Sequence, residues 1–314
     1  LLPVTNVIPI RNPMADRYLY LPSIGFCAVV GWALVEASRA AKQRWGVSRA
    51  GVLALLGAAV FIPWGAVTLK QNTVWGDNMT LWSETARLEP KSAKAHSNLG
   101  ALLVLEGNNG EAEVALKRAI ALDRSDSSAY NNLGYIYEQQ GQTEQAKAYY
   151  REAIRLDPTY PEAHNGMGII LLKEGNNAEA EAAFRRAVAA DRAYVSAYKN
   201  LGFTYQRQGQ TEKAKVAYRE AIRLKPTYAK ALNSLGTLLE SEGNYVEAET
   251  AYRRAMEAEP SFAKAHLNLA ELYINVLGMP EKGLPHLEAV IRLMPDHPLV
   301  ERYRSIVRQI RQGS

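Results

Sequence analysis

Small residues recur at an interval of 34 through most of this chain. One glycine series comprises Gly100, Gly134, Gly168, Gly202 and Gly236, a second comprises Gly107, Gly141, Gly175, Gly209 and Gly243, and an alanine series comprises Ala112, Ala146, Ala180, Ala214 and Ala248. Three series that keep one phase over five periods indicate an array of repeats, not a biased composition. Such arrays stack similar units so that each unit buries its apolar face against its neighbours.

Each repeat has the pattern of two helices joined by a tight turn. In the first repeat Leu99 and Leu103 follow helical spacing, Gly107-Asn108 marks the turn, and Leu116 and Ile120 continue on a second helix. The period and the pattern resemble those of the tetratricopeptide repeat (TPR) family. That resemblance implies an all-α solenoid, a right-handed superhelix of helical hairpins in which the first helices line a groove.

We expect six full repeats over residues 93–296. Residues 76–92 resemble half a repeat at the start of the array, and residues 297–314 have the amphipathic spacing of a capping helix. In the sixth repeat Ala270 replaces the glycine of the first series, and one extra residue precedes Gly278. Such departures are typical of an end repeat.

A longer period of 68 residues is superposed on the array. Odd repeats share EGNN followed by EAE, as in 106–113 and 174–181, whereas even repeats share QGQTE followed by AK, as in 140–147 and 208–215. Two interpretations stay open. Either a stable pair of repeats was duplicated, or the alternation builds a surface for a repetitive partner.

Residues 1–75 predict a membrane segment that precedes the array. The runs 19–38 and 50–69 are mostly apolar, and about 20 apolar residues span a bilayer as a helix. The fold class we expect is therefore two transmembrane helices followed by the solenoid, with the lipid bilayer as a partner of both runs. The alternative is a buried hairpin in a large soluble domain.

Charge predicts the topology of this segment. Residues 1–75 hold seven basic and two acidic residues, which equals the net charge of +5 of the whole chain, so the array is neutral overall. The loop 39–49 carries four basic residues and no acid, which by the positive-inside rule faces the cytoplasm. The array is then extracytoplasmic, in a periplasm or a lumen, and its neutrality argues against a nucleic-acid partner.

Asp16, Arg17 and Tyr20 form a small polar motif before the first apolar run. It is either an interfacial helix anchor or part of a membrane-surface site for a lipid phosphate or a sugar. The chain begins at Leu1 and not at methionine, so we expect upstream sequence to be missing.

The same segment carries a family resemblance. Its matching residues are Ala15, Asp16, Arg17, Leu19, Tyr20, Leu21, Pro22 and Ser23. They resemble the closing membrane segment of the transmembrane and TPR O-mannosyltransferase family and its bacterial relatives. The resemblance implies a membrane glycosyltransferase domain upstream of Leu1 and a TPR array outside the cytoplasm, and it leaves no catalytic residue in this chain.

Asparagines predict a peptide-binding groove on the first helices of the repeats. One row comprises Asn98, Asn132, Asn200 and Asn268, interrupted by Gly166 and Ser234, and beside it lie Asn131, Asn165 and Asn233. Side-chain amides can pair with the backbone of an extended peptide without reading its sequence. The row resembles the asparagine ladder in the TPR domain of O-linked N-acetylglucosamine transferase. Alternatively, an asparagine before Leu-Gly only packs locally.

Charged and aromatic residues extend the predicted groove. Lys199, Arg207, Lys230 and Lys264 add positive charge, and Tyr135 and Phe203 add apolar contact. This pattern permits an acidic or carboxylate-bearing ligand, although charges on a helix face are often only solvated.

Other chemistry is not indicated. His96, His164 and His266 take the aromatic position of the first helix at least one repeat apart, so we expect packing residues, no metal and no cofactor. Two functions remain. The first is a membrane-anchored protein-binding module outside the cytoplasm, which the family resemblance would make the acceptor-binding part of a glycosyltransferase. The second is a non-enzymatic scaffold subunit of a larger complex.

Overall fold

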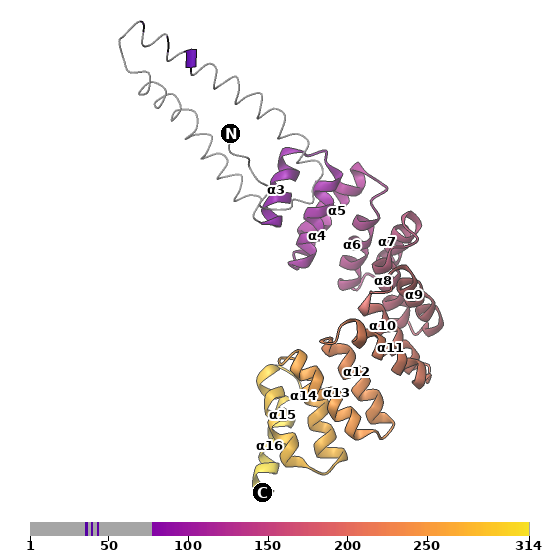
Figure 1. Cartoon of the computed structure of the whole chain (residues 1–314), viewed down its shortest axis with the longest axis vertical. Helices are drawn as coiled ribbons and strands as arrows, with labels where there is room; N and C mark the ends of the chain where they lie inside the picture. The colour runs from indigo at the N-terminus through magenta and orange to yellow at the C-terminus, as the bar shows by residue number, and fades with distance from the viewer. Residues whose placement is uncertain (1–34, 37–38, 40–42, 44–76, 314) are drawn as a thin grey trace. The chain divides into compact units, whose positions relative to one another are not determined.

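The computed structural model describes residues 35–36, 39, 43 and 77–313, and the chain divides into one unit that ends at Leu81 and a second from Trp82 to Ser314. The second unit is helical, and in Figure 1 its helices are arranged one after another in the order of the sequence. α3 (Asn78–Leu88) begins in the first unit and ends in the second; the other helices of the second unit are α4 (Ala93–Leu105), α5 (Asn109–Leu122), α6 (Ser127–Gln139), α7 (Thr143–Leu156), α8 (Pro161–Lys173), α9 (Asn177–Ala190), α10 (Val195–Arg207), α11 (Thr211–Leu224), α12 (Ala229–Ser241), α13 (Tyr245–Ala258), α14 (Ala263–Glu271), η1 (Leu272–Val276), α15 (Pro280–Leu293) and α16 (Val300–Gly313).

Helices α4 to α15 form six antiparallel hairpins, and we call the first helix of each hairpin helix A and the second helix B. The turn between A and B depends on glycine. Gly107 has a φ of 80°, a left-handed conformation that side chains other than hydrogen rarely adopt. The N–H of Asn108 then donates to the carbonyl of Leu103, which satisfies the last turn of α4. The same glycine recurs in the next four hairpins with φ between 72° and 85°.

A second glycine lets the two helices of a hairpin approach. A Cβ atom added to Gly168 in α8 would lie 2.6 Å from Cε1 of Phe184 in α9, too close for any van der Waals contact. Phe184 is fully buried, as are Ala180 and Ala187 on the same face of α9. The 34-residue glycine series therefore marks the points where one aromatic or leucine side chain fills the space above a bare backbone.

Successive hairpins stack through both of their helices. Each helix A contacts the preceding helix B, and it also contacts the helix A of the next hairpin, from α4·α6 through to α12·α14. The A helices thus form one continuous layer of the solenoid. Ion pairs of the even repeats reinforce the stack: Lys147 lies 2.5 Å from Glu174, and 68 residues later Lys215 lies 2.8 Å from Glu242.

The sixth hairpin accommodates its extra residue as a π-helical turn. α14 ends at Glu271 and η1 continues it with wider hydrogen bonding, which is how a helix absorbs a one-residue insertion. Beyond α15, α16 places Tyr303 and Val307 against Leu287 and Val290. This last helix covers the apolar face that the sixth hairpin would otherwise expose.

The structure corrects the predicted fold class. In the described part of the chain no helix is long and apolar enough to cross a membrane, which overturns the expectation of two transmembrane helices in front of the solenoid. The physical reason is length: its longest helices have 14 residues, about 21 Å, against about 30 Å of hydrocarbon. The runs 19–38 and 50–69 lie outside the described residues except for Val35 and Glu36. The bilayer is accordingly not supported as a partner.

Candidate peptide-binding groove

Two aromatic side chains stand exposed on the layer of A helices. Tyr135 of α6 is 42% exposed and Phe203 of α10 is 44% exposed, and both occupy the same position within their repeats. Large apolar side chains exposed at equivalent positions of a repeat array offer contact area to a ligand. They are the apolar part of the groove predicted from the sequence.

Asparagines of neighbouring A helices bind each other. Asn200 Nδ2 donates to Asn165 Oδ1 at 2.8 Å, and Asn268 Nδ2 donates to Asn233 Oδ1 at 2.9 Å. Asn165, Asn200 and Asn233 are buried. Some of the hydrogen bonds that these side-chain amides can make therefore join neighbouring repeats. The structure thus supports the local-packing interpretation for these four asparagines.

The remaining asparagines differ in exposure. Asn98, Asn132 and Asn268 are half-buried, and Asn131 is buried. The row is interrupted at Gly166 because the ring of Tyr150 occupies the place where a side chain would begin. The hydroxyl of Tyr150 donates to Glu138, so this ring is held in place.

Three lysines line one open cavity of about 330 Å³ on the A helices α10, α12 and α14. The cavity is lined by Lys199, Phe203, Lys230, Asn233, Ser234, Phe262 and Lys264. Burial, followed by the positive charges of Lys230 and Lys264, lowers the pKa of Lys199 below its usual value. The structure thus brings together five of the residues predicted from the sequence. We call this group of seven the basic cavity.

Arg207 is used differently. Its Nη1 donates to the main-chain carbonyl of Leu172 at 2.8 Å, close to the end of α8, and it does not line the basic cavity. The same carbonyl also accepts the N–H of Gly175, so Arg207 adds a side-chain hydrogen bond to the last turn of α8. Asp16, Arg17 and Tyr20 lie outside the described residues.

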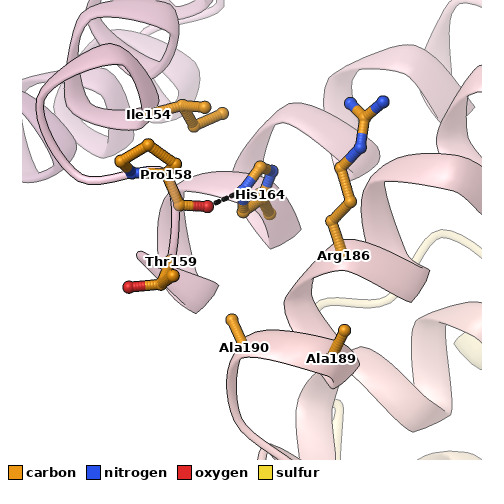
Figure 2. A pocket seen from close by; sticks show the side chains of 7 residues that line it. All are labelled: Ile154, Pro158, Thr159, His164, Arg186, Ala189 and Ala190. Atoms are coloured by element: carbon orange, nitrogen blue, oxygen red, sulfur yellow. Dashed lines mark hydrogen bonds between the residues drawn. The ribbon is translucent and has the colours of Figure 1, made fainter.

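A second cavity of about 440 Å³ lies where α7 and α9 end beside α8. Its lining residues are Ile154, Pro158, Thr159, His164, Arg186, Ala189 and Ala190. Figure 2 shows the ring of His164 beside the carbonyl of Pro158, to which its Nε2 donates at 2.8 Å. With that nitrogen engaged and Arg186 as the one charged side chain of the lining, the cavity holds no acid–base pair.

The other two histidines of this position make the same contact. Nε2 of His96 lies 3.2 Å from the carbonyl of Pro90, and Nε2 of His266 lies 3.1 Å from that of Pro260. A carbonyl oxygen only accepts, so each of these nitrogens is protonated and donates. Within the described residues no group of three or more metal-ligating side chains comes together.

His266 has a partner that the sequence pattern did not indicate. Its Nδ1 lies 3.3 Å from Nδ1 of His286 in α15. Because Nε2 of His266 already carries its proton, the neutral ring accepts at Nδ1 and His286 donates. Burial, then His266 and Arg253, lowers the pKa of His286 below the ordinary 6.5.

We expect the thermal midpoint of the chain to fall as the pH is lowered from about 7.5 to about 5.5. In the unfolded chain His286 regains its ordinary pKa, so below that value the unfolded chain binds more protons than the folded chain. Stability is then complete above pH 6.5 and is lost as the pH falls toward the lowered pKa. His286→Gln should flatten this dependence in differential scanning calorimetry. An equal slope in both proteins would contradict the assignment.

Comparisons with protein families agree with the hairpin geometry. Tetratricopeptide repeat models match residues 127–160, 149–182, 195–228, 217–250 and 239–302, and a TPR repeat model matches residues 102–141. Together these matches cover more than half of the chain. The chain belongs to the tetratricopeptide-repeat family. The TPR assignment predicted from the 34-residue period is thereby confirmed.

Curated relatives of the TPR region are protein O-mannosyl-transferases. Tmtc1 of Drosophila melanogaster is 31% identical over 121 residues, which are 38% of this chain and 14% of that protein. Tmtc2 of the same species is 32% identical over 120 residues, 38% of this chain and 12% of that protein. The TPR chain thus spans less than a fifth of these relatives. They support the resemblance of the repeats, while the resemblance of residues 15–23 is not shown.

Solved TPR structures share the fold. A solved structure from the functional characterization of Pseudomonas aeruginosa pilF has a TM-score of 0.59 at 22% identity, and the match covers 68% of this chain and 96% of that chain. The Cut9–Hcn1 hetero-tetramer of the APC/C has a TM-score of 0.64 at 16% identity, with 87% and 58% covered. At these identities the likeness concerns the solenoid alone.

Three residues of the TPR chain entered the site only through the structure. Phe262 and Ser234 line the basic cavity, and His286 pairs with His266. Phe262 precedes α14 at the position that tyrosine occupies before α8, α10 and α12. That recurrence of an aromatic residue before helix A is a signal in the sequence from which Phe262 could have been predicted.

Proposed function

We propose that this TPR module holds an extended segment of a partner polypeptide along its A helices. One observation carries the proposal: exposed Phe203 stands in an open cavity together with Lys199, Lys230 and Lys264. An apolar ring beside several cations is poorly suited to solvent and well suited to a polypeptide that supplies apolar and polar groups together. Tyr135 extends the same apolar contact to the second repeat.

We further propose that the partner polypeptides are acceptors of O-linked mannose, and that the module selects them for a glycosyltransferase. The similarity of the repeats to those of protein O-mannosyl-transferases supports this proposal. The chemistry of transfer is then carried by another part of the protein or by a partner, and the TPR module contributes the positioning of the acceptor.

Site-specific photo-cross-linking tests the groove. Tyr135 or Phe203 is replaced by p-benzoylphenylalanine in the full chain, and the cells that naturally make the protein are irradiated. We expect defined polypeptide adducts from both positions, because these side chains touch the ligand. Val114 and Val216 are matched controls on helices B, 72% and 65% exposed, and should give none.

The adducts also separate the two candidate functions. Mass spectrometry of cross-linked polypeptides should find O-linked hexose on several different partners, as an acceptor-binding module requires. One unmodified partner at constant stoichiometry would instead establish a scaffold subunit. Equal adducts from Val216 and Phe203 would contradict binding in the groove altogether.

A further inference from the structure

We propose that the basic cavity binds carboxylate side chains of an acidic segment, with acidic residues about three positions apart and an apolar residue between them. This inference rests on the proposed function and specifies its ligand. The cavity belongs to the last three repeats, so the proposal also assigns the acidic part of the ligand to that end of the array.

The first step of the argument is the lack of any internal counter-charge. In the part of the chain that the structure describes, no ion pair joins Lys199, Lys230 or Lys264 to a carboxylate, whereas Lys147 and Lys215 each have two acidic partners. Lys199 is half-buried and feels the other two ammonium groups as repulsion. Like charges gathered without a partner cost stability, and an anionic ligand removes that cost.

The second step is the position of two of these lysines in their helices. Lys230 and Lys264 are the second residues of α12 and α14. The N-terminal turn of a helix carries a partial positive charge that disfavours cations. The same helix position holds Lys94 in the first repeat and Ser128, Glu162 and Ser196 in the second to fourth. A lysine there gains nothing from its own helix, and for Lys230 and Lys264, which lie together in the basic cavity, an anionic ligand would remove that cost.

The third step gives the spacing of the ligand. The three lysines come from three consecutive A helices, and packed helices lie about 8–10 Å apart. A chain in the extended polyproline II conformation advances about 3.1 Å per residue and brings every third side chain to the same side. Carboxylates that meet neighbouring helices are therefore about three residues apart. Several carboxylates along the segment match this spread better than one carboxylate at a chain end.

The fourth step gives the apolar residue. Phe203 and Phe262 line the same cavity as the lysines. A segment of aspartate or glutamate alone would leave both rings without a partner, whereas leucine, methionine or an aromatic residue between the acids would cover them. Asn233 lines the same cavity; its Oδ1 accepts from Asn268, which leaves its Nδ2 to donate to the ligand backbone.

Fluorescence anisotropy of the full chain tests the proposal with designed peptides. The probe is a labelled peptide of about twelve residues with aspartate at every third position and leucine between, and its twin carries asparagine in place of aspartate. We expect the acidic probe to bind about tenfold more tightly than its twin, and to weaken as sodium chloride is raised, because salt screens charge pairs. Each probe is used with a free and with an amidated C-terminus, and amidation should change nothing.

Variants locate the site. Combined Lys199→Gln, Lys230→Gln and Lys264→Gln should abolish the preference for the acidic probe, while Lys94→Gln should keep it. Lys94 occupies the same helix position in the first repeat and is not among the residues of the cavity. A thermal midpoint of the triple variant equal to or above that of the natural chain shows that its fold is intact, because the substitutions remove repulsion between like charges.

Two results would overturn the proposal: equal binding of both probes, or a loss of binding on amidation, which would assign the site to a terminal carboxylate. Adducts at Phe203 that persist with neutral partners would leave the groove function standing while this ligand class fails. Absence of adducts at both Tyr135 and Phe203 would instead reject the groove itself.

Discussion

Gly168→Leu should lower the free energy of unfolding of the array by about 3 kcal/mol and its thermal midpoint by about 10 °C. A Cβ alone would come within 2.6 Å of the Phe184 ring, and leucine adds three more carbons to that place. Phe184 is fully buried, so its ring has nowhere to move without separating α8 from α9. Circular dichroism melts of the full chain measure the change.

Gly110→Ala is the matched control. Gly110 lies in the first turn of α5, and nothing stands within 4 Å of a Cβ added there. Alanine restricts the unfolded chain at such a site and should raise stability by a few tenths of a kcal/mol. If Gly168→Leu melted together with Gly110→Ala, the close approach of helices at the 34-residue glycine would be refuted.

Phe184→Ala should destabilise the array by about 3–5 kcal/mol, because it empties the space above Gly168 and leaves a cavity between the two helices. The chain offers its own conservative substitute. Leu116 occupies the equivalent position above Gly100 in the first repeat. Phe184→Leu should therefore cost about 1 kcal/mol.

Urea denaturation of both variants checks this pair. Multi-repeat arrays can unfold in stages, so the first transition is the one to compare. Equal costs for alanine and leucine would show that the ring matters for its shape and not for the volume it fills.

The fold could be predicted from the repeat because its causes are local and periodic. Gly107 ends helix A in a left-handed turn, and Gly168 admits the Phe184 ring. The one-residue excess before Gly278 was visible in the sequence, but its outcome as the π-helical turn η1 was not. An insertion can lengthen a loop or widen a helix, and packing of Leu272 and Tyr273 decides between them.

The sequence was enough to predict which residues belong to the site, but not which of them form hydrogen bonds with other residues. Lys199, Lys230 and Lys264 could be placed on A helices by phase, and the structure gathers them in one cavity. The sequence could not show that Asn200 donates a hydrogen bond to Asn165, or that Arg207 donates one to the Leu172 carbonyl. Both contacts cross between repeats about 35 residues apart, and their geometry depends on how far each hairpin rotates on the previous one.

The error in the fold class has a different origin. Apolar length in 19–38 and 50–69 is a criterion for the membrane environment, not for the repeat geometry. In the described residues the apolar positions instead serve helices of at most 14 residues that bury small faces against each other. Hydropathy predicted the environment of residues 1–75, and periodicity predicted the fold of the repeats. The described residues test the second of these predictions.

The matching ion pairs of the even repeats have an evolutionary consequence. Lys147–Glu174 and Lys215–Glu242 are the same contact at two seams of the stack, 68 residues apart. A recombination event that removes or inserts one such block rejoins a seam that the protein already contains, so no new complementary surface has to arise. The layer of A helices can therefore grow or shrink by two hairpins at a time while the new seam keeps an ion pair that the chain already uses.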